Sequence, residues 1–434
     1  MKKLLKLNLI VSTFLLFNSS VIGQIYPQFK PIPSSYNVNS QNPVYATDIN
    51  YDIIDLNKQV FHLFLPDTVG SFPLVIFTHG GGYISGTPDI VLSAVERKQD
   101  IKYFLENRIA YASIGYRLIN NTGPDDDGVI KCLDDSKRAL QFIRFYANDL
   151  RIDPTKICLQ GRSAGASSSY WLGTRPDMVA PNSPDPIDRQ STRVCAVDLY
   201  NSQATLDLYK WETQVFNNFD GDGSNYTLDS MANIMGFERA SNFYGGFDSL
   251  YQILVDSILV QYREEVDQLT HISLDDPPMF ISSKSDAIHP KQDLFHHSLH
   301  GQEIYNAATA AGIVEVKADI PALSINTTNG ETGNAFLLRH LNSCSLTTSI
   351  IDKKISDKNI SIFPNPAVNK LTINGLLQKY HISILDNTGQ IQRTINNIES
   401  SVIIDISNLP NGIYVIIVKN LATNELKFKK MIKC

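Results

Sequence analysis

Between residues 24 and 344, short apolar runs alternate with segments that have the residue spacing of helices. The runs are VFHLFL at 60, PLVIFTH at 73, IAYASIGY at 109, KICLQG at 156, VCAVDL at 194, PMFISS at 278 and IVEVKA at 313. Strands that alternate with helices pair mainly in parallel, so this order predicts an α/β fold with a doubly wound, mainly parallel sheet. In such sheets the functional residues follow the carboxyl ends of the strands.

Composition and charge exclude several other classes of protein. With 43% hydrophobic and 19% charged residues, the chain is neither disordered nor a multi-span membrane protein. Its net charge of -6 provides no basic surface for phosphate backbones, so we expect no nucleic acid partner. A length of 434 residues allows one large α/β domain and one smaller domain.

The first 23 residues have the order of a secretory signal peptide. Three lysines precede the apolar stretch from Leu7 to Phe17, and small or polar residues follow as far as Gly23. The stretch is shorter than the roughly 20 apolar residues that a membrane anchor needs. We therefore expect cleavage after Gly23, export, and no transmembrane anchor.

Export would expose the cysteines to an oxidising compartment. There are five of them, an odd number, and no spacing among them predicts a disulfide or zinc framework. Cys158 and Cys195 lie in apolar strand-like runs, so we expect them to be simply buried. Cys344 and Cys434 are either reactive or paired.

The composition changes after residue 344. Residues 345–358 are polar and lack a helical apolar period, which is typical of a linker. Residues 359–434 contain short runs of alternating polarity, separated by turn residues, and this pattern predicts a small antiparallel β-sandwich. The runs are ISIF at 360, KLTI at 370, HISIL at 381, SVIIDI at 401, YVIIV at 414 and LKFKKMI at 426.

This C-terminal region resembles the sorting domain of proteins exported by the type IX secretion system. The resemblance lies in FPNP at 363–366, ISILDNTGQ at 382–390 and LPNGIYVIIVKN at 409–420, in that order. It implies transport across the outer membrane by the type IX machinery, followed by release or attachment at the cell surface. A sugar-binding or adhesive sandwich is the alternative, because a fold alone does not fix a function.

Two glycine-rich segments follow predicted strands of the larger region. Gly161-Arg162-Ser163-Ala164-Gly165 has the G-x-S-x-G pattern of a sharp strand-to-helix turn, which would expose the Ser163 hydroxyl at a helix N-terminus. His79-Gly80-Gly81-Gly82 follows PLVIFT. Residues without a Cβ let backbone N–H groups approach an oxyanion, so Gly81, Gly82 and Ala164 are the expected donors, with His79 bracing the loop.

In this order the two segments resemble the α/β-hydrolases, specifically the hormone-sensitive-lipase-like and feruloyl-esterase-like carboxylesterases. SIGYRL at 113–118 and IDPTKICLQGRSAGAS at 152–167 fit the same pattern, and the resemblance covers about residues 60–340. It implies that Ser163 is the nucleophile of ester hydrolysis through an acyl-enzyme intermediate, without a cofactor or metal.

The acid and the base are harder to assign. Asp286 follows the predicted strand PPMFISS, where this fold places its acid, and the alternative is that it only caps a turn. The usual position of the base is the loop TTNGETGNAF at 327–336, which has no histidine. We therefore look to LFHHSLHGQEIY at 294–305 and favour His297, with His296 nearly equal and His340 third.

A metal is a weaker interpretation of the same histidines. His296 and His300 are four residues apart and could bind a metal together with Asp293, but no metalloprotease signature flanks them. The histidines could also be ordinary polar residues near a helix start. We expect no metal here.

Residues 205–275 are rich in aromatic side chains and are expected to form a cap over the site. The sequence as a whole favours a secreted serine carboxylesterase, whose substrate would be an ester such as an acetyl or feruloyl group on polysaccharide. One alternative is an inactive, hydrolase-like binding or adhesion protein, because the usual histidine is missing. Another is a peptidase or amidase on the same scaffold.

Overall fold

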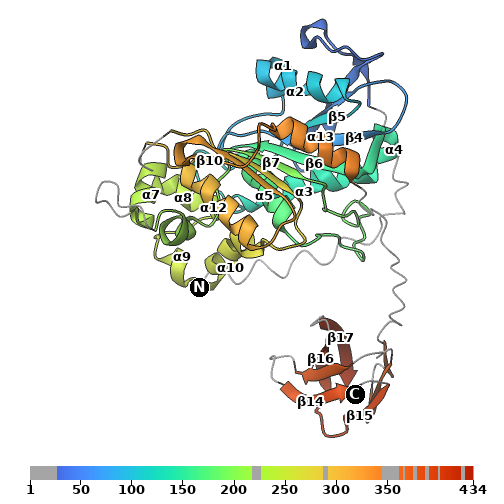
Figure 1. Cartoon of the computed structure of the whole chain (residues 1–434). Coiled ribbons are helices and arrows are strands. Elements are labelled where there is room, and N and C mark those ends of the chain that lie inside the picture. The colour runs from blue at the N-terminus through green and yellow to red at the C-terminus, as the bar shows by residue number, and fades with distance from the viewer. Residues whose placement is uncertain are drawn as a thin grey trace. The chain divides into compact units, whose positions relative to one another are not determined.

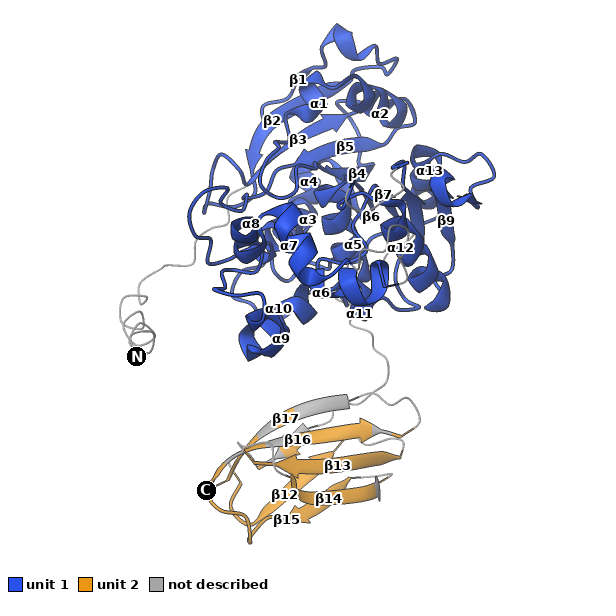
Figure 2. Ribbon diagram, turned by 90° about the vertical axis from the view of Figure 1, so that its left-hand side faces the viewer, with its two compact units in different colours: residues 1–348 blue, residues 349–434 orange. Residues whose placement is uncertain are grey.

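The computed structural model describes two compact units, residues 1–348 and 349–434 (Figure 2). The described residues are 27–217, 226–286, 292–344 and 361–433, the last range without 365–366, 375–378, 387–390, 399–400 and 422–425. The expected signal peptide, the linker at 345–358 and Cys434 lie outside them. Among the described helices, none combines the length and the hydropathy that crossing a bilayer requires.

A ten-stranded sheet forms the centre of the larger unit (Figure 1). Its strand order is β1-β2-β3-β5-β4-β6-β7-β8-β9-β10. Neighbouring strands from β5 to β9 pair in parallel, whereas β1, β2, β3 and β10 join antiparallel at the two ends. The strands are β1 (Lys30–Pro31), β2 (Val44–Asn50), β3 (Val60–Leu65), β4 (Phe72–Thr78), β5 (Ala110–Ile114), β6 (Ile152–Arg162), β7 (Val197–Tyr200), β8 (Met279–Ser282), β9 (Val316–Ile320) and β10 (Ile325–Asn326).

The predicted fold class is confirmed. All seven apolar runs form strands, β3 to β9, in the mainly parallel sheet. Sequence reasoning missed β1, β2 and β10. These strands lie toward the ends of the sheet and contain many exposed residues, so they lack the continuous apolar pattern of a strand buried on both faces.

Helices cover both faces of this sheet, because successive side chains of a strand point to opposite faces. In β4, Val75 packs in one core cluster with Phe104 of α2 and Phe336 of α13. Ile76, the next residue, packs in the other cluster with Leu133 of α3. The helices outside the 205–275 segment are α1 (Ile90–Ser93), α2 (Val95–Glu106), α3 (Ile130–Phe145), α4 (Ala147–Leu150), α5 (Ala164–Thr174), α12 (Ser298–Ala310) and α13 (Gly333–Ser343), with short turns η1 (Ser34–Tyr36) and η3 (Pro321–Leu323).

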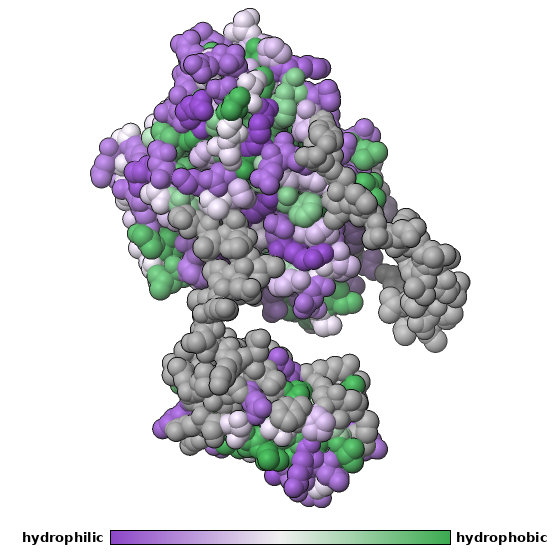
Figure 3. All heavy atoms as spheres, turned by 90° about the vertical axis from the view of Figure 1, so that its right-hand side faces the viewer, coloured by the Kyte–Doolittle hydropathy of each residue, from purple (hydrophilic) through white to green (hydrophobic). Residues whose placement is uncertain are grey.

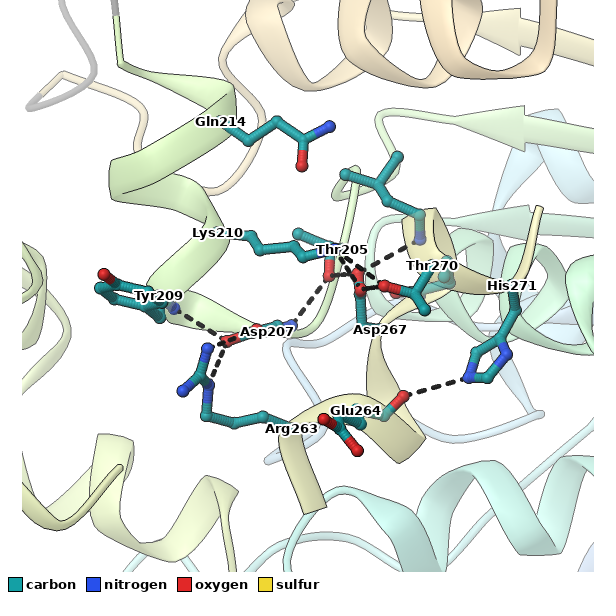
Figure 4. A network of polar contacts seen from close by, with 12 residues as sticks. Thr205, Asp207, Tyr209, Lys210, Gln214, Arg263, Glu264, Asp267, Thr270 and His271 are labelled. Atoms are coloured by element: carbon teal, nitrogen blue, oxygen red, sulfur yellow. Dashed lines mark hydrogen bonds and ion pairs between the residues drawn. The ribbon is translucent and has the colours of Figure 1, made fainter. Parts of the chain in front are cut away.

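Helices also fill the segment between β7 and β8, and a buried polar network ties its two ends together (Figure 4). Lys210 Nζ lies 2.6 Å from Asp267 Oδ2, and Thr205 donates a hydrogen bond to the same carboxylate. Arg263 pairs with Asp207 at 2.7 Å. The helices are α6 (Leu208–Lys210), η2 (Trp211–Val215), α7 (Leu228–Met235), α8 (Phe237–Phe243), α9 (Gln252–Val255), α10 (Ser257–Val266) and α11 (Gln268–His271).

The smaller unit consists of two antiparallel sheets with a shared core (Figure 2). Side chains from both sheets, such as Leu371 and Ile416, pack together in it. The six predicted runs form strands, but β14 was missed because its sequence, IQRTINNI, is largely polar. The sheets are β11-β12-β15 and β14-β13-β16-β17, with β11 (Ser361–Phe363), β12 (Lys370–Asn374), β13 (Tyr380–Leu385), β14 (Ile391–Ile398), β15 (Val402–Asp405), β16 (Gly412–Asn420) and β17 (Leu426–Lys433).

The surface of the larger unit is mostly hydrophilic on the face that Figure 3 shows, with apolar residues in small groups. The most exposed apolar side chains of this unit, including Ile53, Val69 and Val314, come from different parts of the chain. Isolated exposed apolar residues are normal on soluble proteins.

A disulfide joins Cys195, just before β7, to Cys344, just after α13. The expectation that Cys195 is simply buried is therefore wrong, and Cys344 is paired. Cys132 and Cys158 are free and buried. The pair could not be recognised from spacing because 149 residues separate the two cysteines, whose Cα atoms only the tertiary fold brings to 5.8 Å.

We expect Cys344→Ser to lower the free energy of unfolding by about 2–4 kcal/mol, since the disulfide restricts the unfolded chain. Denaturant unfolding followed by circular dichroism measures this change. Adding a reductant should bring the wild-type protein to the stability of the variant and leave the variant unchanged. Equal stability of the two oxidised proteins would contradict a structural role for the bond.

Candidate active site

Ser163 occupies the turn between β6 and α5 in a backbone conformation that is rare for residues with a side chain. Its φ of 55° and ψ of -125° are held by close backbone contacts on both sides. A Cβ on Gly161 would lie 2.2 Å from the carbonyl oxygen of Gly165, and one on Gly165 would lie 2.0 Å from that of Thr78. Only glycine fits at these two positions, so the G-x-S-x-G pattern is a steric requirement here.

An imidazole lies beside the Ser163 hydroxyl. His296 Nε2 is 2.8 Å from Ser163 Oγ, which is a hydrogen-bonding distance. His296 belongs to the segment before α12, and both residues line the same cavity. This contact joins a hydroxyl to a group that can accept its proton.

A carboxylate holds the other side of the imidazole. Asp293 Oδ1 lies 3.2 Å from His296 Nδ1 and also accepts the backbone N–H of His296 at 3.2 Å. Ser285, in the segment that follows β8, donates to Asp293 Oδ2 at 2.9 Å. The carboxylate is thus fixed on both oxygens and can keep a proton on Nδ1, which leaves Nε2 free to accept one.

The loop after β4 presents glycine backbone to the same place. Gly81 and Gly82 have φ values of 122° and 61°, and a Cβ on Gly81 would lie 2.1 Å from the carbonyl oxygen of Ser85. His79 Nδ1 donates to the carbonyl oxygen of Gly80 at 2.7 Å, and its ring stacks on Tyr116. Burial lowers the pKa of His79 to about 4, so it stays neutral and braces the loop.

A cavity of about 810 Å³ opens in front of these groups. It is large enough for a drug-sized molecule. Apolar side chains from the loop after β4, from α1, from the 205–275 segment and from the segment before α12 form much of its wall. These residues are Ile84, Ile90, Leu206, Leu208, Trp211, Met235, Phe243 and Phe295.

The order carboxylate, imidazole, hydroxyl and backbone amides is the arrangement of an acyl-transfer site. Comparison with protein families then gives two matches. Residues 61–242 match the BD-FAE family, and residues 361–433 match the secretion system C-terminal sorting domain.

Residues 61–242 form a BD-FAE domain. This domain is of an α/β-hydrolase esterase family, and residues 361–433 form a sorting domain of the type IX system, as both resemblances predicted. The sorting domain indicates export from the cytoplasm.

Solved structures resemble the BD-FAE domain only distantly. A bifunctional GH43-CE protein from Bacteroides eggerthii has a TM-score of 0.48 and 18% identity over 69% of this chain, which spans 38% of that protein. A truncated carbohydrate esterase from gut microbiota has a TM-score of 0.47 and 15% sequence identity, and the match covers 69% of this chain and 96% of that protein. An acetyl ester-xyloside bifunctional hydrolase from Caldicellulosiruptor lactoaceticus has a TM-score of 0.42 and 16% sequence identity, and the match covers 74% of this chain and 97% of that protein. Curated protein sequences gave no match.

The structure separates the two histidines that the sequence left nearly equal. The sequence favours His297 as the base, but the structure brings His296 to Ser163 instead. His297 is 3% exposed, and its Nδ1 accepts the backbone N–H of Leu299 at the start of α12. His340 lies on α13, 3.1 Å from Glu315, away from the residues that line the cavity.

The carboxylate beside the imidazole is not the one expected from the sequence. Asp286 is exposed, and the carboxylate that contacts His296 is Asp293, seven residues further on. The residue just before Asp286 is Ser285, and its hydroxyl contacts Asp293. The signal that could have found it is the spacing of Asp293 and His296, three residues apart in one tight segment.

Two residues to which the sequence analysis gave no positioning role hold the segment before α12 in place. Gln203, after β7, donates to the carbonyl oxygen of Phe295 at 2.6 Å and is itself held by Ser167 of α5. The fully buried His300 accepts the N–H of Ala204 at 3.2 Å and donates to the carbonyl oxygen of Leu294 at 3.0 Å. The backbone on the N-terminal side of His296 is therefore tied to the helix that follows Ser163.

We expect His300→Phe to lower kcat about 10- to 100-fold, because the ring still packs on Trp211 and Phe216 but both hydrogen bonds are lost. Ester hydrolysis and circular dichroism together measure the effect. His340→Asn, outside the cavity, is the matched control and should keep wild-type turnover. A fully active, folded His300→Phe would contradict this positioning role.

The free energy of unfolding should decrease at acidic pH because of His300. Burial lowers the pKa of His300 from 6.5 to about 3, so below pH 6.5 the unfolded chain binds a proton that the folded chain does not. The free energy of unfolding then decreases as pH falls, by about 1.4 kcal/mol per pH unit for each such group. Unfolding curves between about pH 6 and 4.5 should show a shallower decrease in His300→Phe than in the wild type, and parallel decreases would contradict the prediction.

Proposed function

We propose that this protein is an exported carboxylesterase in which Ser163 is the nucleophile, His296 the general base and Asp293 the residue that orients the base. Gly81, Gly82 and Ala164 supply the backbone N–H groups of the oxyanion hole. The observation that carries the proposal is the contact between Ser163 Oγ and His296 Nε2 at 2.8 Å.

The contacts support a two-step reaction. His296 Nε2 takes the Ser163 proton as the oxygen attacks the ester carbonyl, and the backbone amides stabilise the negative charge of the tetrahedral intermediate. The protonated His296 then gives its proton to the leaving alcohol, and an acyl-enzyme remains. Water, activated by the same imidazole, releases the acid and restores Ser163.

The sorting domain supports a substrate outside the cell, and we infer an ester-linked acyl group on polysaccharide or other environmental material. The apolar wall of the 810 Å³ cavity favours an acyl group larger than acetyl, such as an aromatic acid. The proposed location is outside the cell, with the protein either released or attached to the cell surface.

The alternative of an inactive binding protein was motivated by the lack of a histidine at 327–336. The contact of His296 with Ser163 argues against this alternative, because it supplies an imidazole from another loop. The alternative of a peptidase or amidase requires turnover of amides, so hydrolysis of matched ester and amide substrates separates it from the esterase.

Two matched pairs of variants test the proposed residues. His296→Asn and Asp293→Asn should lower kcat for p-nitrophenyl butyrate about a thousandfold or more, as should Ser163→Ala, since the triad acts as a unit. His297→Asn and Asp286→Asn should retain activity, because asparagine can still cap α12 and Asp286 is exposed.

The outcome that contradicts the proposal is also specific. If His297→Asn or Asp286→Asn were as inactive as Ser163→Ala while His296→Asn and Asp293→Asn turned over normally, the assignment of base and acid would be wrong. Hydrolysis that persists in Ser163→Ala would exclude a serine esterase.

A further inference from the structure

One charged side chain of the 205–275 segment reaches into the cavity beside the proposed oxyanion hole. Arg239, on α8, lines the cavity, and its Nη2 lies 3.4 Å from the carbonyl oxygen of Gly82. The guanidinium carbon lies 4.9 Å from the centre of the Phe295 ring. Gly82 belongs to the loop of the proposed oxyanion hole, and Phe295 precedes the proposed base, His296. The guanidinium therefore lies between these two parts of the site.

Arg239 differs from the other arginines near this segment. Arg263 pairs with Asp207 and Arg175 pairs with Glu265, whereas among the described residues Arg239 forms no ion pair with a carboxylate. It is half-buried, and desolvation lowers its pKa. A cation beside apolar walls costs free energy unless an anion compensates it, so its position calls for a function.

The other charged groups on the cavity wall have partners of their own. Asp89 accepts hydrogen bonds from His62 at 2.9 Å and from Thr87 at 2.7 Å. Arg162 stacks over the ring of Tyr200 at 4.2 Å, and it also lines a second, smaller cavity together with Asp100 and Asp198, whose carboxylates interact with its charge. Arg239 is therefore the lining group best placed to receive an anion from a bound molecule.

We propose that Arg239 recognises a carboxylate on the substrate, so that the enzyme prefers esters whose acyl or alcohol part carries a negative charge near the scissile bond. This rests on the proposed esterase function. A guanidinium binds a carboxylate through two parallel N–H groups, which fixes direction as well as charge. Half-esters of dicarboxylic acids and esters of uronic acid sugars present this group from the acyl side and the alcohol side respectively.

A structural role for Arg239 predicts a different result. If its contact with Gly82 only supported the oxyanion loop, then replacing it would lower the turnover of all esters by the same factor. If it binds a carboxylate, replacement lowers the turnover of anionic esters more. The ratio of kcat/KM for an anionic ester to that for a neutral ester of equal length separates the two roles.

The experiment compares the wild type with Arg239→Gln and Arg239→Lys. The acyl arm uses monoethyl adipate against ethyl hexanoate in a pH-stat, and the alcohol arm uses acetylated methyl galacturonoside against acetylated methyl galactoside. We expect Arg239→Gln to lower the ratio of anionic to neutral kcat/KM about 10- to 100-fold in one arm, and Arg239→Lys to restore part of it. The arm that responds identifies which side of the ester carries the charge.

Ionic strength provides a second readout. The wild-type preference should weaken as salt is raised, and the ratio for Arg239→Gln should change little, since it has no charge to screen. An unchanged ratio in Arg239→Gln in both arms would overturn the inference. Hydrolysis of p-nitrophenyl butyrate by the same preparation tests the esterase proposal separately. If this hydrolysis is lost in Ser163→Ala, the esterase proposal holds whatever the ratio for Arg239→Gln.

Discussion

The sharp turn at Ser163 is the constraint on which the rest of the site depends. The chain leaves β6 and enters α5 within one residue, and the backbone on both sides approaches so closely that Gly161 and Gly165 have no room for a Cβ. The turn places the hydroxyl at the end of the sheet beside the loop that follows β4. Because β4 and β6 are paired in parallel, Ser163, the proposed nucleophile, and the glycine loop after β4 are neighbours by topology.

The proposed base, His296, lies further along the chain, and tertiary contacts hold its segment in place. Gln203 and His300 bind the carbonyl oxygens of Phe295 and Leu294, on the N-terminal side of His296. Ser298 donates to the carbonyl oxygen of Ser285 on its other side. The segment is therefore fixed at both ends, which gives a loop histidine the defined position that proton transfer needs.

Three histidines within five positions have three different environments. His296 is partly exposed and faces Ser163, His297 caps α12, and His300 is buried between Trp211 and Phe216. Their local sequence gives no basis for distinguishing them, because each is a histidine at the start of a helix. Which one can accept a proton from Ser163 depends on the direction of each side chain, and packing against β8 and the 205–275 segment sets that direction.

Strands β3 to β9, the sharp turn at Ser163 and the glycine loop after β4 could be predicted from the sequence. These features follow from local requirements, namely apolar runs for buried strands and glycine where backbones approach closely. The pairing of Cys195 with Cys344, the contact of His296 with Ser163 and the place of Arg239 beside Gly82 depend on tertiary packing. In each case the distance between the two groups depends on how segments far apart in the chain pack together. The local sequence around each group does not indicate that distance.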